Sequence, residues 1–138
     1  DTELGEMHWR DLKVSELVAL GGNRLLVLEC GSATTKLYAV GLDPTCVIAD
    51  AYLDIATRPT LEELSGSGQI DRRIPQLAKT LLLTTDDHVE VGTDLEGIAL
   101  LSAEAILLVN DNDFGIEDAQ TCFWRVDLAP HARHDRSA

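Results

Sequence analysis

Short apolar runs alternate with small polar turns along most of the chain, a pattern typical of antiparallel β-sheet. Residues 14–20 alternate loosely, and the Gly-Gly-Asn at residues 21–23 supplies the positive-φ positions of a tight hairpin turn. Further short strands are expected over residues 25–28, 36–42 and 46–53. The pattern therefore predicts four consecutive strands joined by short connections.

Residues 54–79 interrupt this pattern. Thr60 and Glu63 have the spacing of a capping box, which predicts a short helix beginning at Thr60. A Ser-Gly-Ser-Gly run ends that helix, so the segment is expected to be an insertion between two strand-rich units. Strands resume over residues 80–84, 95–101, 106–109 and 121–128.

The two strand-rich units form an internal repeat. Three segments match in the same order, residues 15–20 with 95–100, 25–29 with 107–111 and 36–42 with 122–128, at offsets of 80, 82 and 86. The growing offset places the extra residues in the hairpin loops, where insertions are tolerated best.

A repeat of short antiparallel strands is typical of a β-propeller blade. We therefore expect an all-β fold with about two propeller-type blades, at residues 14–53 and 80–128, inside a domain of residues 1–129. Residues 130–138 are expected to be a flexible tail. Two blades cannot close a ring, so the expected alternatives are part of a larger propeller or an open stack of two sheets.

The repeat puts acidic residues at corresponding strand ends. Glu16 and Glu96 begin the first strand of their units, and Glu29 and Asp111 end the antiparallel partner strand. These four positions should share one edge of the fold, because the start of a strand lies beside the end of its antiparallel neighbour.

Such an all-oxygen cluster suits Ca²⁺ or Mg²⁺ better than zinc. The predicted metal ligands are Glu29, Asp94, Glu96, Asp111 and Asn112. The alternative is that these residues cap strand ends and accept hydrogen bonds from backbone N–H groups.

The charge balance limits the possible partners. Eleven Lys and Arg against 24 Asp and Glu give a net charge of −13. Nucleic acid and anionic lipid are both repelled by such a charge, so neither is an expected partner. The apolar runs are also far shorter than the roughly 18 residues that a membrane span needs.

Other candidate residues have simpler explanations. Cys30, Cys46 and Cys122 form no C-x-x-C pair, and the last two lie in apolar strand-like runs where a buried thiol is expected. His88 follows two aspartates and is expected in a solvated turn. Two further groups remain: the His131 and His134 pair is expected in a mobile tail, and Trp9 and Trp124 are expected to be packing residues.

Four stretches resemble the C-terminal part of the family called "esterase-like activity of phytase", bacterial propeller proteins. They are residues 14–29, 79–83, 94–100 and 107–114, the last followed by a strand at 121–123. The Glu-Gly at 96–97 and the Asp-Asn-Asp-Phe at 111–114 are the most specific parts. Cys30 stands where the family has a basic residue, and Leu95 stands where it usually has Asn.

The resemblance implies a propeller, an exported protein found outside the cell or in the periplasm, and phosphoester or ester hydrolase activity. A calcium-dependent hydrolase would use Glu96, Asp111 and Asp113 as catalytic residues, with a small phosphoester as substrate. Lys36 or Arg24 could contact a substrate oxygen.

The alternative is a non-catalytic propeller module that binds calcium for structure or mediates protein interaction. The chain begins at Asp1 without a signal peptide, so it is expected to be a domain or fragment of a longer protein. Self-association, or packing against the remainder of a larger propeller, is expected through four outward apolar residues, Leu25, Val27, Leu107 and Val109.

Overall fold

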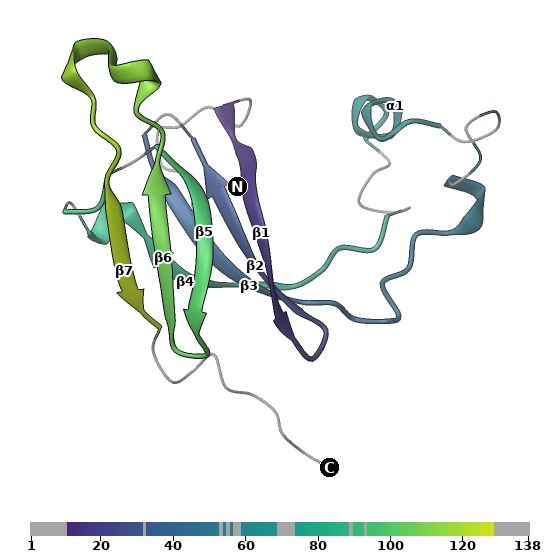
Figure 1. The fold of residues 1–138 in the computed structure, drawn as a ribbon. Helices are drawn as coiled ribbons and strands as arrows, with labels where there is room; N and C mark the ends of the chain where they lie inside the picture. Colours follow the sequence, from purple (N-terminus) through teal and green to yellow (C-terminus); the bar gives the residue numbers. More distant parts are fainter. Residues whose placement is uncertain are drawn as a thin grey trace.

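The computed structural model describes residues 11–128 except 32, 53, 55, 57, 58, 69–73, 89 and 93. These residues form two antiparallel sheets (Figure 1). The first sheet contains β1 (Lys13–Gly21), β2 (Arg24–Cys30), β3 (Thr35–Gly41) and β4 (Lys79–Thr84), in that order. The second contains β5 (Leu95–Ser102), β6 (Ala105–Asn110) and β7 (Phe123–Asp127). The predicted antiparallel β fold is confirmed.

The expected strand over residues 46–53 is wrong. Residues 46–49 are irregular, and the 3₁₀ helix η3 (Asp50–Tyr52) follows them. The side chain of Asp43 accepts hydrogen bonds from the backbone N–H and the hydroxyl of Thr45, at 2.8 and 2.7 Å, which turns the chain away from the sheet. Strand β4 pairs with the free edge of β3 instead, although the sequence pattern grouped it with the second unit.

The segment between β3 and β4 carries the predicted short helix, α1 (Leu61–Gly66). The Thr60 hydroxyl accepts from the Glu63 N–H at 3.2 Å, and the Glu63 carboxylate accepts from the Thr60 N–H at 2.9 Å, so the capping box is confirmed. Figure 1 shows α1 standing away from both sheets. The helix therefore covers neither of them.

The hydrophobic core lies between the two sheets. It consists of Leu26, Leu28, Leu37 and Leu83 from the first sheet, Leu95, Ile98, Ile106 and Leu108 from the second, and Val91 from the connection between them. Strands β1 and β2 approach the second sheet through β5, and Figure 1 shows β1 and β5 side by side and running in the same direction.

The two hairpins have the same hydrogen-bond register. Gly21 pairs with Arg24 in the first and Ser102 pairs with Ala105 in the second, so each hairpin has a two-residue turn. Both β1 and β5 shift register twice, between Val14 and Glu16 and between Ala19 and Gly21 in β1, and at the positions 81 residues later in β5. The internal repeat is therefore present in the structure, with shared bulges.

The structural offset differs by one residue from the offset in the sequence alignment. Residues of β1 and β2 correspond to residues 81 positions later, whereas the alignment gave 80 and 82. The offset of 86 between β3 and β7 agrees. A shift of one residue exchanges the two faces of a strand, so it changes which side chains correspond.

The corrected register shows how the sheets stack. Leu28 faces the core, but its counterpart Val109 lies on the outer face of the second sheet. Conversely, Leu108 faces the core and its counterpart Val27 lies on the outer face of the first sheet. Equivalent faces of the two sheets therefore point the same way, whereas a face-to-face sandwich would bury equivalent faces against each other.

Candidate functional site

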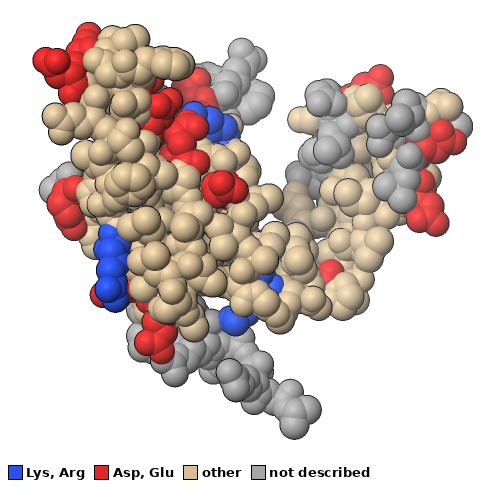
Figure 2. Space-filling model, in the orientation of Figure 1, with Lys and Arg blue, Asp and Glu red and all other residues tan. Residues whose placement is uncertain are grey.

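The strand ends that carry the predicted acidic cluster do share one edge of the fold. Val14 at the start of β1 pairs with Glu29 at the end of β2, and Leu95 at the start of β5 pairs with Asn110 at the end of β6. The Cys30 thiol lies 3.6 Å from the Asp94 carboxylate and connects the two sheets there. Figure 2 shows acidic side chains at the upper end of the sheets with a basic side chain among them.

Two of the predicted ligands form ion pairs with lysines. Glu96 in β5 pairs with Lys13 in β1, and this hydrogen bond raises the pKa of Lys13. Glu29 pairs with Lys79 of β4 at 2.9 Å, and the Lys79 ammonium also lies 4.1 Å from the centre of the Tyr38 ring. Lysine side chains therefore provide the positive charge that the sequence analysis assigned to a shared metal ion.

The other acidic residues at this edge bond to nearby backbone. The Asp111 carboxylate accepts from the Asp113 N–H at 3.2 Å, and the Asp94 carbonyl accepts from the Asp111 N–H at 3.1 Å. Glu16 accepts from the N–H of Leu17 at 3.0 Å. These contacts match the alternative in which the acids cap strand ends.

The described residues form no close cluster of three metal-ligating side chains at the acidic edge. In the part of the chain that the structure describes, no three His, Cys, Asp or Glu side chains gather closely enough to hold a metal ion. Calcium takes six to eight oxygen ligands. Calcium binding therefore stays a prediction, and a calcium titration of the melting temperature tests it directly.

Sequence analysis did not identify Lys13 and Lys79 as partners of these acids. Lys13 directly precedes the first strand expected from the sequence, at the same edge as the predicted cluster, and this position was the available signal. The one-residue register difference also matters, because Glu96 corresponds to Ser15 in the structure and not to Glu16.

The two predicted substrate-contacting residues lie at opposite ends of the first sheet, with Lys36 paired to Glu29 at the acidic edge. The Lys36 side chain is only 6% exposed, and its ammonium lies 3.9 Å from the carboxylate of Asp86. Arg24 begins β2, at the opposite end of the strand from Glu29.

Lys36 belongs to a buried polar cluster at the junction of β3 and β4. The other buried members are Thr34, Thr35, Thr84 and Thr85. The Thr85 hydroxyl accepts from the Thr35 N–H at 2.9 Å, and the Thr84 hydroxyl donates to Asp86 at 2.9 Å. The cluster therefore joins the two strands by side-chain contacts at the point where the 3₁₀ helix η4 (Thr85–Asp87) begins.

This cluster makes stability depend on pH. Hydrogen bonds from Thr34 and Thr84, together with the Lys36 charge, lower the pKa of Asp86 below its ordinary value. A lowered folded-state pKa gives stability that is fully present above the unfolded pKa of about 3.9 and is lost as the pH falls through the folded value.

We expect Asp86→Asn to lower the free energy of unfolding at pH 7 by less than about 1 kcal/mol, because the carboxylate is half exposed. The variant should also lose less stability than the wild type below about pH 4. Urea unfolding at pH 7 and pH 3 measures both effects, with Asp87→Asn as the matched control. Equal acid sensitivity of the wild type and Asp86→Asn would contradict this role.

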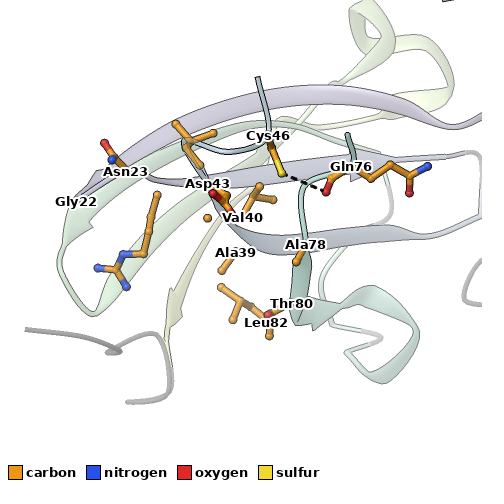
Figure 3. A pocket seen from close by; sticks show the side chains of 13 residues that line it. Gly22, Asn23, Ala39, Val40, Asp43, Cys46, Gln76, Ala78, Thr80 and Leu82 are labelled. Carbon is orange, nitrogen blue, oxygen red and sulfur yellow. Dashed lines mark hydrogen bonds between the residues drawn. The ribbon is translucent and has the colours of Figure 1, made fainter. Parts of the chain in front are cut away.

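A pocket of about 600 Å³ lies at the end of the first sheet opposite the acidic edge (Figure 3). Its lining includes the turn before β2, the end of β3 and residues from the segment between β3 and β4. The Cys46 thiol lies 3.7 Å from the carbonyl oxygen of Gln76, as Figure 3 shows. Arg24 and Asp43 are the charged residues in this lining, and Cys46 contributes its thiol.

A second hollow of about 590 Å³ lies between the outer strands β4 and β7. Leu82, Trp124 and Val126 line it and pack against the core, and the Trp124 indole N–H donates to the carbonyl of Glu90 at 3.0 Å. The prediction that Trp124 is a packing residue is confirmed. The sheets are thus in contact at β1 and β5 and separated at β4 and β7, which gives the pair a wedge shape.

The cysteines differ from expectation. Cys46 is half-buried in an irregular segment and Cys122 is exposed, so the prediction of two buried thiols is wrong. The reason is that neither residue lies in a strand. Cys30 is buried, and this burial raises the pKa of its thiol. The three cysteines form no disulfide with one another.

His88 is exposed, as expected for a turn, and its Nδ1 lies 3.2 Å from Glu90. Trp9, His131 and His134 lie outside the described residues.

Within the described ranges, no helix is long and apolar enough to cross a membrane.

Comparison of the chain with protein-family models, with curated proteins and with solved structures found no significant match. The candidate function therefore rests on the geometry of this chain.

Proposed function

We propose that the chain is a pair of propeller-type blades that acts as a non-catalytic assembly module and takes a further blade of the same kind on an outer sheet face. The observation that carries this proposal is the stacking of equivalent faces in the same direction. The face that is buried in the first sheet is exposed in the second sheet. A further sheet can therefore pack on either outer face in the same way, so the stack can continue in both directions.

The outer faces have the composition of an interface. On the first sheet, Leu17 is 52% exposed and Leu81 is 41% exposed, and they lie at the two ends of a cross-strand row whose middle positions are the half-buried Val27 and the buried Tyr38. On the second sheet, Phe123 is 64% exposed and lies beside Val109. Apolar rows of this kind on sheet faces mark packing surfaces.

The occupant that fits these faces best is a second copy of the same blade type. The outer face of the first sheet corresponds by register to the core face of the second sheet, which already packs against a sheet of this kind. A copy of this chain carries the complementary face. The net charge of −13 opposes association of copies, so salt should favour it.

The phosphoester hydrolase function that the family resemblance implies stays a prediction. Its expected catalytic residues include Glu96, which pairs with Lys13, and Asp111, which accepts a backbone N–H. These contacts support a structural role for the acidic residues at the strand ends. We therefore propose an assembly function in preference to a catalytic one.

Sedimentation equilibrium at micromolar concentration and raised salt tests the proposal. We expect a wild-type mass above the 15.0 kDa of one chain. Phe123→Lys should shift the mass toward one chain, because it places a charge in the proposed interface. Ala103→Lys, in the exposed β5–β6 turn, is the matched control and should associate like the wild type.

A wild-type chain that sediments as a single 15.0 kDa species at all concentrations and salts would overturn the proposal. Association that Phe123→Lys leaves unchanged would overturn the assignment of this outer face.

A further inference from the structure

The connection between β6 and β7 ends in an exposed apolar tip. Phe114 is 99% exposed and Ile116 is 64% exposed. Both belong to the 3₁₀ segment η5 (Asp113–Asp118), which rises beyond the ends of the second sheet in Figure 1. A fully exposed phenylalanine is unusual, because burying its ring in the protein would be favourable.

The base of this connection is held firmly by one side chain. The Asn110 amide donates to the carbonyls of Asp111 and Gln120, at 2.8 and 3.0 Å, and its oxygen accepts from the Cys122 N–H at 2.6 Å. Asn110 thus ties together the two ends of the connection. The two ends of the connection, from which the tip projects, are therefore held in place by Asn110.

The backbone of the tip is strained. Phe114 has a φ of +58° and Glu117 a φ of +56°, and Asp113 and Asp118 are also in the left-handed region. This region is unfavourable for residues other than glycine, and such residues gather at ligand-contacting segments. In this backbone conformation the Phe114 side chain is almost fully exposed.

The charge around the tip is of one sign. Asp111, Asp113, Glu117 and Asp118 flank Phe114 and Ile116 in the sequence, and residues 111–122 contain no Lys or Arg. A partner that accepts the ring must therefore present positive charge around an apolar pocket.

We infer that the η5 tip is a recognition element for a protein partner with an apolar pocket rimmed by Lys or Arg, into which Phe114 inserts. Anionic lipid is repelled by the four carboxylates. The inference concerns a different surface from the proposed blade interface, so Phe123→Lys should leave it intact.

The test begins with photo-crosslinking of the full chain. p-Benzoyl-phenylalanine is placed at position 114 or, as the control, at position 47, because Val47 is also exposed, at 68%. The probes are irradiated in an extract of the source cells and the cross-linked peptides are sequenced. We expect an adduct specific to position 114, on a partner segment flanked by Lys or Arg and suppressed by excess wild-type chain.

The purified partner is then titrated with variants. Phe114→Ser should weaken binding about 30-fold, as for an aromatic hot spot, while Val47→Ser should bind like the wild type. Combined Asp113→Asn, Glu117→Gln and Asp118→Asn should reduce the salt dependence of binding.

Four results would overturn the inference. They are adducts no stronger at position 114 than at position 47, adducts only with a second copy, a partner site without basic residues, and stable binding of the chain to phosphatidylglycerol vesicles through the tip.

Discussion

Leu28→Ala is expected to destabilise the protein by about 2–5 kcal/mol, which is the largest effect of any single substitution considered for this fold. Leu28 is 0% exposed and belongs to the core that both sheets share. Removing its side chain leaves a cavity that two packed sheets can only partly fill. Because domains of this size are stable by about 5–15 kcal/mol, the loss is a large part of the total.

Thermal and urea unfolding followed by circular dichroism measure this effect, and the melting temperature should fall by roughly 10 °C. Val47→Ala, at a position that is 68% exposed and outside both sheets, is the matched control and should change stability by less than about 0.5 kcal/mol. Similar losses in the two variants would show that the core does not lie between the sheets.

Gly97→Ala should cost about 1–3 kcal/mol, because the added methyl group has no space. A Cβ atom at Gly97 would lie 2.6 Å from Cγ1 of Val109, its cross-strand partner. Valine has few alternative rotamers, so the backbone of β5 or β6 must move. Gly97 directly follows the β5 bulge at Glu96, so its pairing with Val109 depends on the register that this bulge sets.

Val109→Ala in the same chain should restore most of the lost stability, and a double-mutant cycle measures this coupling. Gly41→Ala is the control, since a Cβ atom there meets nothing within 4 Å. If Gly97→Ala were as stable as Gly41→Ala, the close approach of β5 and β6 would be wrong.

Sequence patterning predicted the β class and most strands because alternation of apolar and polar residues reflects burial of one sheet face. It failed at residues 46–53, where Val47 is apolar but 68% exposed. No local signal showed that β4, after a long insertion, would pair with β3. Pairing between distant segments depends on packing and not on local propensity.

The repeat was found from sequence, but its register was not. An alignment by residue type matches Ala19 with Ala99 and Leu20 with Leu100, and it is therefore shifted by one position from the hairpin register, in which the bulge at Ser15 corresponds to the bulge at Glu96. That shift paired Glu16 with Glu96 and suggested a symmetric carboxylate cluster. The edge location of the acids was correct, while their lysine partners depend on side-chain directions that the alignment could not give.

The central claim is that equivalent faces of the two sheets point the same way. Methyl NOESY spectra of the full chain test it most directly. We predict contacts between Leu26 or Leu28 of the first sheet and Ile98, Ile106 or Leu108 of the second. Contacts from the same first-sheet methyl groups to Leu107 and Val109, without contacts to Ile106 and Leu108, would show a face-to-face sandwich and contradict the account.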